Sequence, residues 1–199
     1  MAGSSEKTLE FIRAQLERRE RFDGVAPATA AVVGLCGLGG ALGAVLRGAS
    51  FATGSDFHDP LLHWLAVLAV TAFLYVAASA RGDREWRFTH LKPVARFAYS
   101  CQLAAMSVAA LLTFALGQTD ARGLIPALWL LCYGLGLWPA SMVAGPAFRV
   151  ASVGLVALGS AALVFPSSEH LWLGAGFGGM HVVMGIVLWF TQRQRYSTS

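Results

Sequence analysis

The apolar positions of this chain are gathered in six long runs that short polar segments separate. A helix rises about 1.5 Å per residue, so about 20 apolar residues cross a hydrocarbon core about 30 Å thick. The six runs are Ala26–Leu46, Pro60–Ala80, Val94–Gly117, Gly123–Ala144, Pro146–Phe165 and Glu169–Thr191. This pattern predicts an all-α, polytopic membrane protein with six transmembrane helices.

Two of the boundaries carry residues that are typical of helix ends. Asp59 and Pro60 suit the N-cap and the first helical position of the second span. The fourth and fifth runs are divided only by Gly145 and Pro146, a pair that ends one helix and starts the next.

The segment before the first run, SEKTLEFIRAQLERRERF, has a different pattern. Its apolar residues Leu9, Ile12 and Leu16 recur at helical spacing among charged ones. We therefore expect a cytoplasmic amphipathic helix that lies on the bilayer surface or binds a cytoplasmic protein partner. The expected organisation is this helix over residues 1–25, a transmembrane bundle over 26–191 and a cytoplasmic basic tail over 192–199.

Composition supports the membrane assignment and sets its orientation. Charged residues make up 13% of the chain, about half of the roughly 25% found in soluble domains. With the N-terminus inside, 13 of the 15 Lys and Arg residues fall on the cytoplasmic side, and only Arg47 and Arg122 fall outside. This asymmetry predicts a bacterial inner-membrane protein with both termini in the cytoplasm. The basic residues lie in short loops, so the bilayer rather than nucleic acid is the expected partner.

One polar side chain, His181, interrupts the stretch LGAGFGGMHVVMGIVLWF. On a helix it shares a face with residues three, four and seven positions away. Three glycines lie on that face, namely Gly174, Gly178 and Gly185. Small residues of this kind permit close helix contact in bilayers, so His181 is expected to point into the bundle.

A buried imidazole needs a partner, because an unpaired polar group in hydrocarbon is costly. Counting from the span ends, Cys36, Ser107, Cys132 and Tyr133 should lie at a similar depth. In the first interpretation, a neutral His181 forms a hydrogen bond with a carbonyl, Ser107 or Tyr133 and fixes how the helices pack. No cofactor is required by this interpretation.

A second interpretation makes His181 a ligand. With Cys36 and Cys132 it forms a chemically plausible set for copper(I) or zinc. A haem with two axial histidines would need a second imidazole at this depth, and His63 lies nearer the outer interface. A haem held by one histidine and a small carrier also stay open, although every Asp and Glu lies in a loop or at a span end.

The loop FATGSDFHDPLLHW holds a second group of potential ligands, Asp56, His58, Asp59 and His63. They either hold a divalent metal at the outer surface or belong to a solvated connection with a helix cap, and the second interpretation is preferred. The three cysteines all lie in apolar runs, so a disulfide framework is not expected.

The stretches EFIRAQLERRERF, LWLLCYGLGLW and GAGFGGMHVVMGI, followed by a basic tail, resemble a group of small six-helix bacterial inner-membrane proteins without an assigned activity. The resemblance implies architecture and location only.

The sequence therefore predicts a non-enzymatic membrane protein with a structural, regulatory or sensory task. The alternative is a small carrier or a redox protein that binds a metal or haem through His181. A homo-oligomer is compatible with both.

Overall fold

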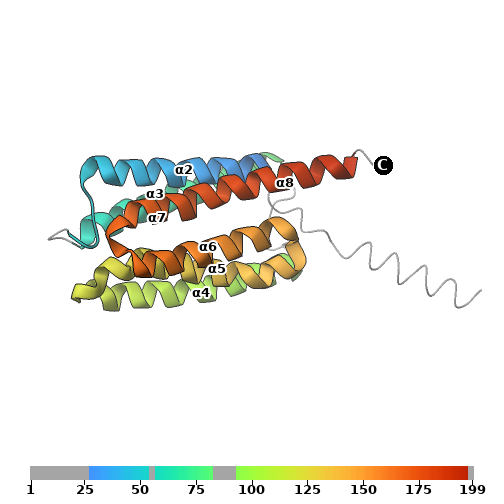
Figure 1. Cartoon of the computed structure of the whole chain (residues 1–199). Helices are drawn as coiled ribbons and strands as arrows, with labels where there is room; N and C mark the ends of the chain where they lie inside the picture. Colours follow the sequence, from blue (N-terminus) through green and yellow to red (C-terminus); the bar gives the residue numbers. More distant parts are fainter. Residues whose placement is uncertain (1–26, 54–56, 83–92, 197–199) are drawn as a thin grey trace, which may run out of the picture.

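The chain folds into a helical bundle in the computed structural model, which describes residues 27–53, 57–82 and 93–196 (Figure 1). Its helices are α2 (Pro27–Arg47), α3 (His58–Gly82), α4 (Pro93–Gly117), η2 (Asp120–Leu124), α5 (Ile125–Ala144), α6 (Pro146–Val164), η3 (Pro166–Ser168), α7 (Glu169–Leu173), η4 (Gly174–Gly179) and α8 (Met180–Tyr196). Six of the described segments are long and apolar enough to cross a membrane. The predicted number and order of long apolar helices are confirmed. The amphipathic helix expected over residues 1–25 lies outside the described residues.

The observed helix ends follow from backbone chemistry. After Arg47, Gly48 takes a φ of 66°, and the N–H groups of Gly48 and Ala49 donate to the carbonyls of Val45 and Ala44. This is a Schellman motif, which glycine permits because it has no Cβ to clash in the left-handed region. Gly145, with a φ of 96°, separates α5 from α6, as the sequence predicts.

Some predicted boundaries are wrong. Helix α3 begins at His58, so Asp59 lies in its first turn and is not the N-cap. The sixth span ends at Thr191 as predicted, but helix α8 continues beyond it to Tyr196, and the span contains a π-helix over Gly174–Gly179. A π-helix adds a residue to the turn, which apolar periodicity alone does not show.

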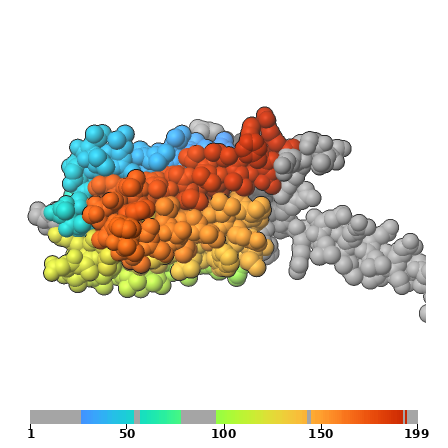
Figure 2. All heavy atoms as spheres, viewed as in Figure 1, coloured from blue at the N-terminus to red at the C-terminus, as the bar shows by residue number. Residues whose placement is uncertain are grey.

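The helices form two layers: α2, α3 and the α7–η4–α8 segment make up one, and α4, α5 and α6 make up the other (Figure 1). Helix α2 packs on α3 and on the α7–η4–α8 segment, and α5 packs on α4 and α6. The layers meet mainly where α8 packs on α6, and Figure 2 shows α8 lying between α2 and α6 on one face of the bundle. At the other side of the layers, no comparable packing joins α3 to α4 among the described residues.

The two halves of the bundle are packed differently. We call the half that holds the start of α2 and the end of α8 the terminal half, and the other the opposite half. The core of the opposite half contains large side chains such as Phe51, Trp64 and Leu130. The core of the terminal half consists of five alanines with Phe148 and Met184. Because alanines fill little volume, the terminal half has room for a cavity.

Large apolar side chains cover the outside of the bundle. Phe73, Leu103, Leu111 and Phe114 are each at least 70% exposed. Only 11% of the span residues in α3 and in α4 are buried, against 39% in each of the other spans. Helices α3 and α4 are therefore the most peripheral members of the bundle.

Candidate functional site

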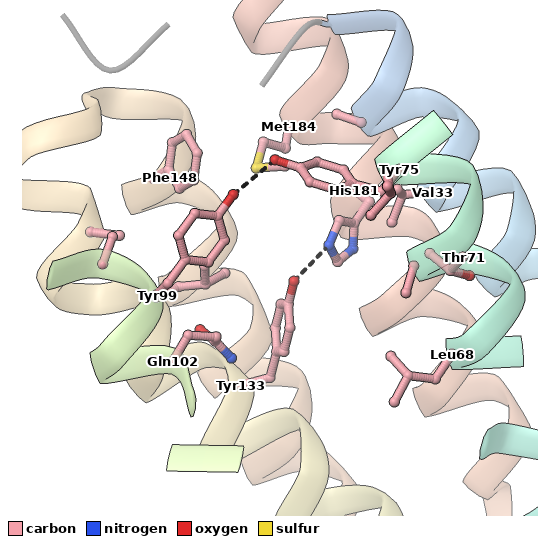
Figure 3. A pocket seen from close by; sticks show the side chains of 16 residues that line it. Val33, Leu68, Thr71, Tyr75, Tyr99, Gln102, Tyr133, Phe148, His181 and Met184 are labelled. Carbon is pink, nitrogen blue, oxygen red and sulfur yellow. Dashed lines mark hydrogen bonds between the residues drawn. The ribbon is translucent and has the colours of Figure 1, made fainter. Parts of the chain in front are cut away.

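His181 lies at the start of α8 and faces the interior of the bundle, as its glycine-rich face predicts. Its side chain is 8% exposed, and its Nε2 atom lies 3.0 Å from the hydroxyl of Tyr133 on α5 (Figure 3). Tyr133 in turn contacts Phe177 edge-to-face, with ring centroids 5.4 Å apart. The structure thus places beside His181 one of the partners that the packing interpretation names, Tyr133.

Glycines bring α2 against the segment that carries His181. A Cβ atom placed on Gly178 would lie 2.6 Å from Cγ of Leu38, and one on Gly185 would lie 2.9 Å from the carbonyl oxygen of Pro27. Gly37 of α2 approaches the backbone of Gly178 equally closely. Only residues without a Cβ permit this approach, which fixes the position of α8 and hence of the imidazole.

A cavity of about 420 Å³ lies beside the Tyr133–His181 pair in the terminal half. Each of the six long helices contributes to its wall. Its lining residues are Ala30, Val33, Leu68, Thr71, Ala72, Tyr75, Val76, Ala98, Tyr99, Gln102, Tyr133, Leu137, Ala140, Phe148, His181 and Met184. The volume is in the range of small-molecule sites, which is about 300–1,000 Å³.

The cavity wall is mainly apolar and carries a few polar groups. The hydroxyls of Tyr75 on α3 and Tyr99 on α4 lie 3.0 Å apart and bridge the two peripheral helices (Figure 3). The Thr71 hydroxyl donates to the carbonyl of Val67 within its own helix. Gln102 carries an amide whose nitrogen and oxygen are both buried without a hydrogen-bond partner in the described part of the chain. The described side chains that line the cavity are all of uncharged types when His181 is neutral.

The other predicted partners of His181 do not join it. Ser107 is exposed, and its hydroxyl donates to the carbonyl of Leu103 in its own helix, so the expectation that Ser107 pairs with His181 is wrong. Cys36 and Cys132 are half-buried free thiols, and neither lines the cavity. Within the ranges that the structure describes, no three His, Cys, Asp or Glu side chains come together as a metal-binding group. The copper or zinc set is therefore not assembled there.

The predicted group of ligands in the outer loop has a different arrangement. Arg47 donates to Asp59 at 2.9 Å and lies 3.4 Å from Nδ1 of His63. Nε2 of His63 lies 2.8 Å from the carbonyl oxygen of Gly40, so Nε2 carries the proton and Nδ1 accepts from Arg47. These contacts tie the end of α2 to α3. Asp56 lies outside the described residues.

Sequence reasoning missed one buried carboxylate in the opposite half. Glu169 is 4% exposed, and its two oxygens accept from the backbone N–H of Phe51 at 2.9 and 3.2 Å. Because Glu169 begins the sixth apolar run, the sequence indicated a carboxylate in contact with water at the end of a span. The contact with Phe51 depends on how the α2–α3 connection folds back over α7, which sequence pattern does not give.

It also missed three polar residues of the cavity, namely Tyr75, Tyr99 and Gln102. Gln102 was detectable in principle, because it is a long amide within the apolar stretch AYSCQLAAM. A polar side chain inside a span is commonly functional or paired.

No protein-family model matches the chain, and no curated protein or solved structure is similar to it. The geometry of the cavity therefore carries the functional argument.

Proposed function

We propose that this chain is a multi-pass protein of a bacterial inner membrane, with both termini in the cytoplasm. The six apolar helices and the large exposed apolar side chains support the membrane location. The excess of Lys and Arg in the sequence segments expected inside the cell supports the orientation. In this orientation the terminal half, with its cavity, lies on the cytoplasmic side of the membrane.

We infer further that the protein is non-enzymatic and serves a sensory or regulatory task by binding a lipid-soluble small molecule in this cavity. The observation that carries the inference is the uncharged cavity of about 420 Å³ beside the Tyr133–His181 pair. Apolar walls with a few convergent polar groups are the usual composition of small-molecule sites. A neutral ligand suits these walls, because a buried charge would lack a counter-charge.

The arrangement of the helices supports entry from the bilayer. Helices α3 and α4 are the most exposed of the bundle and form opposite walls of the cavity. A sensory task also requires an output, and residues 1–25 offer the expected contact with a cytoplasmic protein. A haem or metal held by Nε2 of His181 would displace the hydroxyl of Tyr133 from that atom, whereas Nδ1 has no hydrogen-bond partner among the described residues.

The test is to fill the cavity and to measure what purifies with the protein. Ala98 is 7% exposed and lines the cavity from α4, whereas Ala104 is exposed on the same helix. Native mass spectrometry of protein in mild detergent should show a bound small lipid in the wild type and in Ala104→Leu. The lipid should be lost in Ala98→Leu, because the added isobutyl group occupies the cavity.

Two outcomes would contradict the proposal. One is equal retention of the same lipid by both variants, which would place that lipid on the outside of the bundle. The other is a Soret band or stoichiometric copper or zinc that disappears in His181→Ala, which would make His181 a ligand.

A further inference from the structure

Two residues of the cavity wall have buried polar atoms without a hydrogen-bond partner among the described residues, namely His181 at Nδ1 and Gln102 at both polar atoms of its amide. Gln102 is the one whose polar atoms all lack a partner. Its Oε1 and Nε2 atoms are both shielded from solvent, and neither has a hydrogen-bond partner among the described residues. Buried polar atoms are nearly always paired, because leaving one unpaired costs about 1–3 kcal/mol. The amide thus has an unused acceptor and two unused N–H donors, and because Gln102 lines the cavity, a rotation of its side chain would present these groups to a ligand there.

The neighbouring helix makes room for this amide. A Cβ atom on Gly136 of α5 would lie 2.8 Å from Oε1 and 3.1 Å from Cδ of Gln102. Glycine at this position thus permits the amide to lie against α5. Figure 3 shows Gln102 on the same wall of the cavity as Tyr133.

We propose that Gln102 is the specificity-determining residue of the cavity and that the ligand is an uncharged lipid alcohol. A hydroxyl both donates and accepts, so one hydroxyl matches the Oε1 acceptor and the Nε2 donor of the amide. An apolar chain matches the rest of the wall, including Val33, Leu68 and Val76. A carboxylate is disfavoured as the head group, because none of the described residues that line the cavity is a Lys or an Arg.

This inference rests on the proposed function and deepens it. The lipid alcohol could derive from an acyl chain or from a prenyl chain, and both share the same head group. The experiment uses dodecanol and farnesol to distinguish these sources.

The test measures equilibrium binding of tritiated ligands to the full chain in nanodiscs. Dodecanol, dodecane and ionised dodecanoate are compared at equal chain length, and farnesol is compared with dodecanol. Wild type should bind dodecanol about tenfold more tightly than dodecane, which corresponds to about 1.4 kcal/mol. Dodecanoate should bind at least as weakly as dodecane.

Gln102→Leu, which keeps a similar side-chain size, should reduce the preference for the alcohol to about onefold by weakening the binding of dodecanol. Ser107→Ala is the matched control, because the Ser107 hydroxyl lies on the same helix outside the cavity lining and already donates to the carbonyl of Leu103. It should retain the tenfold preference.

The possible failures are distinguishable. If wild type binds dodecanol and dodecane equally, or if Gln102→Leu keeps the preference, the role of Gln102 is wrong while the cavity remains a binding site. If wild type binds none of the ligands, the proposed function itself fails. Where Gln102→Leu does not fold, Gln102→Met, which keeps the length of the side chain without its amide, takes its place in the comparison.

Discussion

The hydroxyl of Tyr133 and Nε2 of His181 lie 3.0 Å apart and join α5 to α8 across the two layers of the bundle. The two residues are far apart in the sequence, and each comes from a different layer. Because the imidazole is buried in apolar surroundings, this hydrogen bond satisfies a group that would otherwise be costly to bury. The pair therefore stabilises the contact between the layers next to the cavity.

Removing either member of the pair should destabilise the protein. In membrane proteins such side-chain hydrogen bonds contribute about 0.6 kcal/mol on average and up to about 2 kcal/mol. Tyr133→Phe and His181→Phe should each lower the unfolding free energy by about 1–2 kcal/mol in detergent. The double variant should lose less than the sum, which a double-mutant cycle measures. Additive losses would show that the two side chains act independently.

The glycine contact between α2 and the π-helix should tolerate no side chain. A Cβ atom on Gly37 would lie 2.7 Å from the backbone nitrogen of Gly178, whereas one on Gly39 meets nothing within 4 Å. Gly37→Ala should therefore cost about 2 kcal/mol or more, because backbone atoms must move. Gly39→Ala, in the same helix, should be neutral or slightly stabilising. Thermal unfolding of both variants in one detergent makes the comparison, and equal stability would argue against the close contact.

The number of long apolar helices was predictable because each apolar run has the length of about 20 residues that a helix needs to cross a bilayer. The division between α5 and α6 was predictable because Gly145 and Pro146 form the only helix-ending pair within that apolar stretch. The inward direction of His181 was predictable from its neighbouring glycines, since helical periodicity fixes which residues share a face. Depth along the spans led correctly to Tyr133. It failed for Ser107, because depth does not give the rotation of a helix about its axis.

The cavity was not predictable from the sequence. It depends on alanines such as Ala98 and Ala140 meeting in one half of the bundle, and on the separation of α3 from α4. Alanine is compatible with close packing as well as with a cavity, and only the positions of six helices together decide between them. The unpaired amide of Gln102 was unpredictable for the same reason, because whether a side chain finds a partner depends on how the neighbouring helices are placed.

Glu169 should be important for the stability of the opposite half. Its carboxylate accepts from the N–H of the fully buried Phe51, a hydrogen bond to a charged group worth about 1.5–3 kcal/mol. Glu169→Leu should lower the unfolding free energy by about 2–3 kcal/mol, because it leaves this N–H buried and unpaired. Asp120→Leu, at an exposed carboxylate near the same end of the bundle, should change it by less than about 0.5 kcal/mol. Similar losses in the two variants would show that the Phe51 contact contributes nothing.

The proposed orientation can be measured with reporter fusions. An alkaline phosphatase joined after Gln118, between α4 and α5, should be active because this connection is expected outside the cytoplasm. The same enzyme joined after Gly145, between α5 and α6, should be inactive, and a fluorescent protein there should be bright. Arg149, beside this junction, belongs to the excess of basic residues inside. The reverse pattern would invert the topology and place the cavity near the outer surface.

The hydrogen bond between the Tyr75 and Tyr99 hydroxyls should control how fast a ligand enters and leaves the cavity. It is 3.0 Å long and bridges α3 and α4, which share no extensive packing among the described residues. Tyr99→Phe removes the bond, so the two helices separate more readily. We expect the dissociation rate of a bound lipid alcohol to rise about three- to tenfold, equivalent to about 0.6–1.4 kcal/mol. Ser100→Ala is the control, because this exposed hydroxyl on α4 donates to the carbonyl of Phe97 in its own helix, and its rate should equal that of the wild type. Stopped-flow displacement of a fluorescent ligand measures both rates. An unchanged rate in Tyr99→Phe would mean that ligands reach the cavity by a route other than the space between α3 and α4.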